Sequence, residues 1–241
     1  MGNENGEWIL HGIKGNDPRC IHTPGQLLGL IEEVGFLPLF SCGIPGASVE
    51  ERTVADWWWS GNEKRDPWEW RRLIAASGKA AYGKFFDRKV GFISLSWLPA
   101  FINVRRDGYD FEGYWEDGKA TSRAKNIMQL FETHDELFSY EIKRMAGFGK
   151  NGEKNFEGSV TELMMKTFLT VKDFRMRLNR QGIPYGWHIA VYSTPEYIWG
   201  EELVNAAETE KPEDSARRIL LYLKKMYPYA QEKQLRKLIG M

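Results

Sequence analysis

Residues 139–193 hold the pattern that most constrains the fold of this chain, two short helices followed by a β-hairpin. The first strand of the hairpin alternates apolar residues with arginines: Phe174, Arg175, Met176, Arg177 and Leu178. Because residues i and i+2 of a strand share a face, we expect the three apolar side chains in the core and both arginines outside it. The segment Asn179–Gly182 supplies a turn, and Tyr185–Ser193 returns as the second strand.

Two short helices followed by a hairpin with a basic outer face are typical of a winged helix, a fold found most often in nucleic-acid-binding proteins. Arginine binds phosphate through two parallel hydrogen bonds and fits a narrow groove, so the hairpin arginines are our first candidates for nucleic-acid contact. These are Arg175, Arg177 and Arg180. The alternative is a solvated strand face that binds nothing.

Three lysines and a glycine-rich loop form a second group of candidates. The lysines lie before or on the second helix of the pair, which we predict at residues 161–171: Lys150, Lys154 and Lys166. The loop Gly147–Gly158 contains four glycines and could bring backbone amides close to phosphate. It lacks the order GxxxxGK[ST], so nucleotide binding has little support.

The balance of charge argues against a protein that coats nucleic acid without specificity. The chain has 241 residues, with 33 Lys and Arg against 33 Asp and Glu. Non-specific affinity for DNA comes largely from neutralising phosphates, and proteins that bind in this way are usually basic. A local basic patch remains compatible with a net charge of zero.

The sequence predicts a cytoplasmic protein without a metal site or cofactor. It contains no apolar run of the roughly 18 residues that a membrane helix needs, and no basic start followed by an apolar run. Cys20 and Cys42 are expected to be free thiols. The four histidines lack the spacing of a metal motif: His11, His22, His134 and His188. The oligomeric state does not follow from the sequence.

A second segment repeats the order of elements found in the hairpin region. Residues 68–101 and 160–200 each run helix, strand, turn, strand and then a Ser- or Thr-capped helix with Trp and Pro. We therefore predict an α+β, mostly helical fold of tandem winged-helix units with a C-terminal helical extension. The expected segments are an N-terminal arm (1–23), a first unit (24–108), a second unit (109–200) and C-terminal helices (201–241).

Tryptophan is concentrated between residues 57 and 70, where five of the ten tryptophans lie. Three of them are candidates for stacking on a flipped or unpaired base: Trp58, Trp68 and Trp70. Adjacent tryptophans more often divide between core and surface, and we favour core packing here. The polar neighbours Glu69, Arg71 and Arg72 leave a pocket possible.

Several stretches resemble bacterial proteins related to AlkZ (YcaQ). They are PWEWR, AAYGKFF, SLSWLPAF, GFGKNGEKNFEGSVTELMMKTFL and YGWHIAVYSTPE. The resemblance covers roughly residues 24–235. AlkZ-type enzymes are DNA glycosylases, built from tandem winged helices, that excise alkylated bases. The resemblance therefore implies winged helices, a role in DNA repair and double-stranded DNA as the partner.

The glycosylases carry a Gln-x-Gln or Gln-x-Asp motif that positions the attacking water. The corresponding stretch here is Glu33–Leu39, which has Leu37 and Leu39 in those slots. An apolar side chain cannot orient or activate water. Glu32 and Glu33 are the only acids near this position, and we expect them on the outer side of the helix 23–35, where a carboxylate is a poor base.

Three hypotheses about function follow. The first is a DNA-binding protein of the AlkZ-related group, associated with repair but without catalysis. The second is an active glycosylase that uses Glu32 or Glu33. The third is a protein- or small-molecule-binding module that uses the Trp-rich region, which the neutral charge mildly favours.

Overall fold

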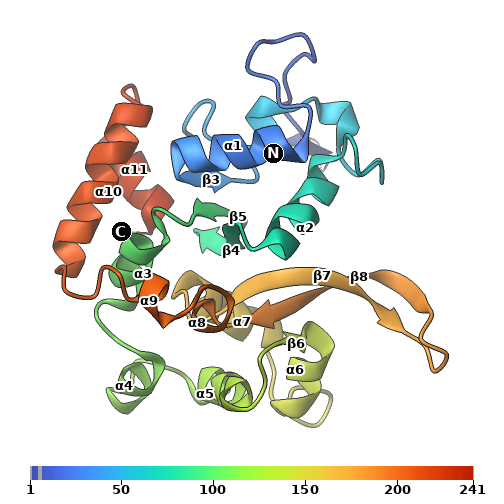
Figure 1. Cartoon of the computed structure of the whole chain (residues 1–241), viewed down its shortest axis with the longest axis vertical. Helices are drawn as coiled ribbons and strands as arrows, with labels where there is room; N and C mark the ends of the chain where they lie inside the picture. The colour runs from blue at the N-terminus through green and yellow to red at the C-terminus, as the bar shows by residue number, and fades with distance from the viewer. Residues whose placement is uncertain (1, 5–6, 241) are drawn as a thin grey trace.

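The computed structural model describes residues 2–4 and 7–240. It is an α+β structure in which helices surround small antiparallel sheets (Figure 1). The α-helices are α1 (Pro24–Val34), α2 (Pro67–Ser77), α3 (Leu98–Arg106), α4 (Phe111–Glu116), α5 (Ser122–Met128), α6 (Ser139–Met145), α7 (Phe156–Met165), α8 (Pro195–Trp199), α9 (Glu201–Val204), α10 (Pro212–Met226) and α11 (Glu232–Ile239). The strands are β1 (Gly2–Glu4), β2 (Glu7–Ile9), β3 (Phe36–Pro38), β4 (Ala80–Phe86), β5 (Lys89–Ser94), β6 (Leu137–Phe138), β7 (Thr170–Leu178) and β8 (Pro184–Ser193).

Two halves of the chain share one topology. The first half runs α1, β3, α2, β4 and β5, with short 3₁₀ turns at Glu50–Arg52 and Ala55–Trp57 between β3 and α2. Its sheet has the order β3-β5-β4. The second half runs α5, β6, α6, α7, β7 and β8, and its sheet has the order β6-β8-β7. Residues 1, 5 and 6 of the expected N-terminal arm lie outside the described residues.

The helices of the first half begin and end where local chemistry predicts. The Thr23 hydroxyl accepts a hydrogen bond from the Gln26 amide, and Pro24 occupies the first turn of α1. Asp66 caps α2 by accepting from the Trp68 amide, at 2.8 Å. Gly35, with φ of 76°, ends α1 and turns the chain directly into β3.

The sheet of the first half is buried on both faces. Leu37, Tyr82 and Phe92 face a core shared with α1, α2 and the second half. The neighbouring Phe36 and Ile93 face a second core, built with α3, α10 and α11. This alternation follows from the two-residue period of a strand. The C-terminal helices therefore cover a sheet face that would otherwise be exposed (Figure 1).

The two halves pack reciprocally. Helix α2 of the first half lies against β7, and helix α7 of the second half lies against β4. At the junction, the Thr170 hydroxyl donates to the Tyr82 carbonyl oxygen at 3.0 Å, and Lys84 Nζ donates to Thr161 Oγ1 at 3.1 Å. Each helix that precedes a hairpin is thus held between the two halves.

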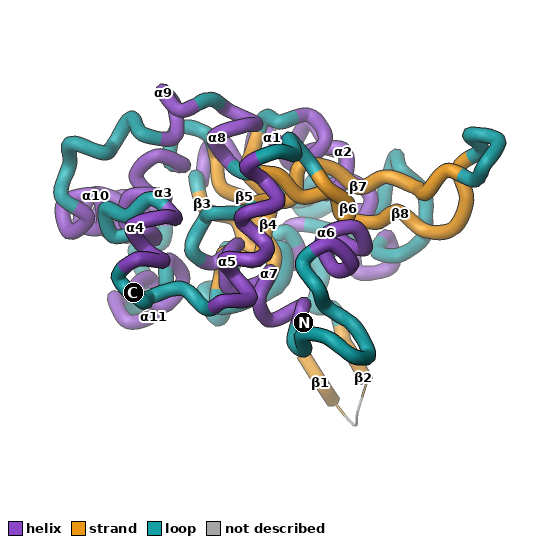
Figure 2. The backbone as a smooth tube through the Cα atoms, turned by 90° about the horizontal axis from the view of Figure 1, so that it is seen from below, coloured by secondary structure: helices purple, strands orange, loops and turns teal. Residues whose placement is uncertain are grey.

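The hairpin of β7 and β8 projects from the body, whereas the hairpin of β4 and β5 does not (Figures 1 and 2). The short turn of the first hairpin, Asp87–Arg88, has both residues at positive φ, and Lys237 of α11 lies 3.3 Å from Asp87. In the long hairpin, the Asn179 side-chain oxygen accepts from two turn amides. Gly182 has φ of 77°, as the sequence predicts.

Two predictions for the second half were wrong. The helix predicted at 161–171 is α7, Phe156–Met165, because Thr167 adopts a left-handed φ of 61° that a threonine rarely takes. The prediction that Phe174, Met176 and Leu178 of β7 all lie in the core was also wrong. Leu178 is 63% exposed, since the hairpin has left the core by this point.

Candidate nucleic-acid interface

Two arginines of β7 lie over a pair of stacked rings. The ring centroids of Phe138 and Tyr140 are 5.2 Å apart with 28° between the ring planes, at the start of α6. The guanidinium carbon of Arg175 is 5.4 Å from the Phe138 ring centroid, and that of Arg177 is 4.2 Å from the Tyr140 centroid. The structure therefore places both arginines on one face, and aromatic contact restricts their motion.

Arg175 is already neutralised by neighbouring carboxylates. Glu136 binds both Arg175 and Lys172, the latter at 2.6 Å, and Asp173 lies 3.2 Å from Arg175. Partial burial would raise the pKa of Glu136, but hydrogen bonds from Lys172 and Arg175 outweigh it and hold that pKa below its ordinary value. Arg175 therefore has little charge to offer a phosphate.

Arg177 and Arg180 are exposed, and neither makes an ion pair with any residue that the structure describes. Arg180 lies in the turn at the tip of the hairpin. From residue 174 to residue 193 the chain has three arginines, one histidine and no aspartate or glutamate. In a chain whose total charge is zero, this hairpin is a local concentration of positive charge.

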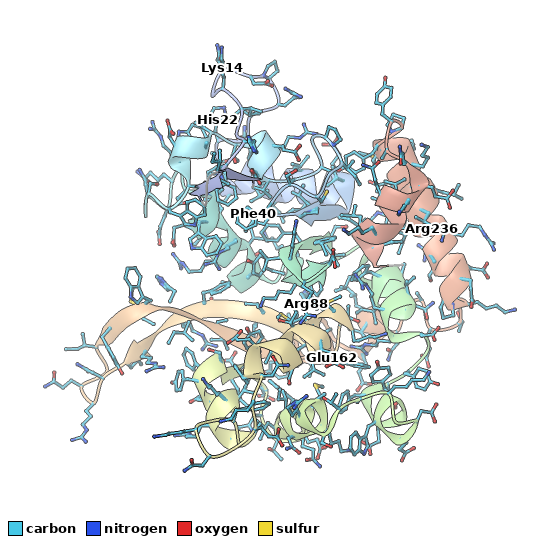
Figure 3. The ribbon with its side chains drawn as sticks, turned by 180° about the vertical axis from the view of Figure 1, so that it is seen from behind. Lys14, His22, Phe40, Arg88, Glu162 and Arg236 are labelled. Carbon is cyan, nitrogen blue, oxygen red and sulfur yellow. The ribbon has the colours of Figure 1, made fainter. Side chains whose placement is uncertain are left out.

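An open cleft of about 730 Å³ follows the hairpin. Its walls come from five elements, β7, β8, α2, β6 and the start of α6, and include Arg177, Tyr140, Arg72 and His188. Figure 3 shows side chains that stand outward along the hairpin, while the labelled Arg88 and Glu162 lie on the body of the molecule. The cleft thus combines aromatic rings with cationic groups along a projecting element.

The lysine candidates lie outside the hairpin. Lys150 is exposed in the loop between α6 and α7. Lys154 closes that loop, since its Nζ donates to the carbonyl oxygens of Gly149 and Lys150 at 3.2 and 2.8 Å. Lys166 is half-buried at the end of α7, 5.5 Å from the Tyr114 ring, and burial lowers its pKa. The structure does not bring these lysines together with the arginines.

Neither helix that precedes a hairpin presents a basic face. In α7 the outward residues include Glu157, and Val160, Leu163 and Met164 are buried. In α2, Arg72 is bound by Glu69 at 3.2 Å and by Glu63. The second arginine of α2, Arg71, lies between two aromatic rings at the junction of the halves.

The Trp-rich segment is mainly a packed cluster. Trp70 is fully buried and Trp58 is 5% exposed, so no base can stack on either in this conformation. Their indole N–H groups are used internally, for Trp58 by Thr53 and for Trp70 by the Glu63 carbonyl. The third candidate, Trp68, is half-buried, with the guanidinium carbon of Arg71 3.7 Å from its ring. The candidate base-stacking role of Trp58 and Trp70 is thus replaced by core packing.

The slots that correspond to the catalytic motif are inaccessible. Leu37 and Leu39 are both fully buried in the core that the two halves share. Glu32 and Glu33 are exposed on α1, on the outer side that the helical period predicts. The Glu33 carbonyl oxygen accepts a hydrogen bond from the Tyr222 hydroxyl. The acid that the fold places beside this stretch is Glu50, which is fully buried and whose backbone amide donates to the Leu39 carbonyl oxygen at 3.0 Å. Its carboxylate accepts hydrogen bonds from the Ser41 and His11 amides, both at 2.9 Å.

In the described part of the chain, no group of three or more His, Cys, Asp or Glu side chains is arranged to hold a metal ion. None of the helices in these residues is both long and apolar enough to span a membrane.

Sequence reasoning missed Glu136, Phe138 and Tyr140. They precede or begin α6, and nothing in their spacing indicates contact with a strand more than thirty residues later. The sequence offers only the aromatic-polar-aromatic order of Phe138, Ser139 and Tyr140, which does not identify a partner strand.

One comparison with known proteins gave a match. A family model described as "AlkZ related" matches residues 21–240. No curated protein and no solved structure matches the chain.

Proposed function

Since the chain belongs to the AlkZ-related family, we propose that it is a repair-associated protein that binds double-stranded DNA through the hairpin of β7 and β8. The family supports a role associated with DNA repair. The choice of the hairpin comes from the structure, because Arg177 and Arg180, which make no ion pair with any described residue, lie on an element that projects from the body (Figure 2).

The topology supports two winged-helix units in tandem. In the second half, a helix, a strand, two helices and two strands follow one another, and the sheet has the order β6-β8-β7. The first half repeats this with 3₁₀ turns in place of the second helix. We assign the units to residues 24–108 and 109–200, and the C-terminal helices to residues 201–241.

The observation that carries the proposal is the exposure of Arg177 and Arg180 without a carboxylate partner among the described residues. Exposed cations that are free of ion pairs can neutralise phosphates and release counterions, which is the main source of affinity for DNA. The Tyr140 ring restricts Arg177, so less side-chain entropy is lost on binding. The partly acidic α7 and the ion-paired α2 are poorer candidates.

The other two hypotheses have less support. A glycosylase needs a group that orients water, and Leu37 and Leu39 are apolar and fully buried. A binding module in the Trp-rich region needs accessible rings, and Trp58 and Trp70 are in the core. We therefore propose binding without base excision.

Fluorescence anisotropy with a labelled duplex at low salt tests the proposal. We expect Arg177→Ala and Arg180→Ala to weaken binding, and each to reduce the slope of log affinity against log salt by about one. Arg217→Ala is the matched control, because Arg217 is exposed on α10 and bound to Asp214. The proposal is wrong if the wild-type protein does not bind, or if both hairpin variants bind like the control.

A further inference from the structure

The end of the long hairpin carries an unusual group of exposed apolar side chains. Their exposed fractions are 63% for Leu178, 54% for Ile183, 50% for Tyr185 and 89% for Trp187. Single exposed apolar residues are common on proteins, but a contiguous group usually marks a binding surface. Trp187 has the largest side chain of the four and is almost fully exposed.

A bulge in β8 extrudes Trp187. Arg175 pairs with Ile189 and Arg177 pairs with Tyr185, so β7 advances by two residues while β8 advances by four. The two extra residues lie around Gly186, whose φ of 78° is a conformation that favours glycine. The bulge interrupts the regular ladder, and Trp187 lies within it.

The charge around Trp187 identifies the kind of partner. The hairpin contains Arg177, Arg180 and His188 and has no acidic residue between positions 174 and 193. A second copy of the chain that used the same surface would bring like charges together. A polyanion is complementary to it, and of the polyanions a nucleic acid also provides flat rings on which an indole can stack.

The bases in a regular duplex are stacked on one another. A projecting indole can therefore stack only on a base that is not held in this stack. Unpaired bases stack on tryptophan, with a gain that depends little on the identity of the base. A bulged or mismatched base also costs less to move out of the helix than a paired one does.

We propose that Trp187 stacks on an unpaired base while Arg177 and Arg180 bind the neighbouring phosphates. The preferred substrate class is then DNA with a local defect in pairing, such as a single-base bulge. This inference rests on the proposed binding of DNA by the hairpin. It adds that the hairpin selects DNA that contains an unpaired base.

The test compares a matched duplex with the same duplex carrying one bulged 2-aminopurine, whose fluorescence falls when it stacks on an aromatic ring. We expect the wild-type protein to bind the bulged duplex about tenfold more tightly than the matched one and to quench the 2-aminopurine. Trp187→Ala should abolish both the preference and the quenching while retaining affinity for the matched duplex, and Trp187→Phe should restore part of both. Trp59→Ala is the control, since Trp59 is 51% exposed but lies outside the hairpin.

The outcomes separate this inference from the proposed function. If wild type and Trp187→Ala bind both duplexes equally well, the hairpin binds DNA but Trp187 does not select unpaired bases, and the inference is wrong. If the wild-type protein binds neither duplex, the proposed function itself fails. If Trp187→Ala instead abolishes self-association measured by sedimentation and leaves both affinities unchanged, the exposed group is a contact between copies and the inference is again overturned.

Discussion

The guanidinium carbon of Arg71 lies 4.2 Å from the centroid of the Phe174 ring. Arg71 belongs to α2 of the first half and Phe174 to β7 of the second, so this contact joins the two halves where the long hairpin leaves the body. The Trp68 ring covers Arg71 at 3.7 Å, and burial lowers the pKa of Arg71. The direction of the hairpin is thus set by packing at its base.

We expect Phe174→Ala to lower the free energy of unfolding by about 2 kcal/mol, because it removes a half-buried ring together with its contacts to Arg71 and Tyr82. Urea denaturation measures this. Leu178→Ala, on the same strand but largely exposed, should change stability by less than about 0.5 kcal/mol. Equal effects of the two changes would contradict the role assigned to the junction.

Gly35→Ala should destabilise the protein strongly. Gly35 has φ of 76°, and a Cβ atom there would lie 2.6 Å from a carbon of the Trp97 ring. We expect a loss of about 2 kcal/mol or more in the free energy of unfolding. Gly29→Ala is the matched change, since Gly29 lies in α1 with open space around it and should gain up to about 1 kcal/mol. A neutral Gly35→Ala would show that the turn between α1 and β3 is less constrained than the structure indicates.

Glu136→Gln should increase affinity for duplex DNA. The change removes the carboxylate that binds Lys172 and Arg175, so Lys172 becomes available to phosphate while Arg175 keeps its ion pair with Asp173. The slope of log affinity against log salt should become steeper by about one. Glu112→Gln, which frees Lys125 away from the hairpin, serves as the control. An unchanged slope in Glu136→Gln would place DNA somewhere other than this face of the hairpin.

The stabilisation by Glu136 should depend on acid pH. The pKa of Glu136 in the folded protein lies below its ordinary value of 4.5, so its ion pairs contribute fully above that value. The contribution is lost as the pH falls through the lowered folded-state pKa. The difference in unfolding free energy between wild type and Glu136→Gln should be constant near neutral pH and shrink towards zero in acid. If the difference in unfolding free energy between wild type and Glu136→Gln grew in acid, the ion pairs of Glu136 would not stabilise the fold as proposed.

We expect no release of bases from alkylated duplex DNA by the purified protein. Glu32 and Glu33 are exposed on α1, Leu37 and Leu39 are apolar and buried, and the buried carboxylate of Glu50 beside Leu39 accepts hydrogen bonds from the Ser41 and His11 amides. Chromatography of the freed bases measures this directly. Excision that disappears in Glu32→Gln or Glu33→Gln would restore the glycosylase hypothesis.

The sequence by itself determined the local elements that short-range chemistry controls. Thr23 with Pro24 and Asp66 with Pro67 mark helix starts, because a cap and a proline act within one turn. The alternation in residues 172–178 placed Arg175 and Arg177 on one face. The resemblance to the AlkZ-related family, carried by contiguous motifs, was confirmed by the family match.

Only the tertiary structure decided which of these residues are available to a partner. Arg175 and Arg177 are two positions apart and share a strand face by period. Glu136 nevertheless neutralises Arg175, whereas Arg177 contacts the Tyr140 ring and makes no ion pair within the described part of the chain. Trp70 and Trp187 are the same residue type, but one is fully buried and the other is 89% exposed. Ion pairing and burial depend on contacts between segments that are distant in sequence and that the reciprocal packing of the two halves brings together. A local sequence pattern does not contain information about those contacts.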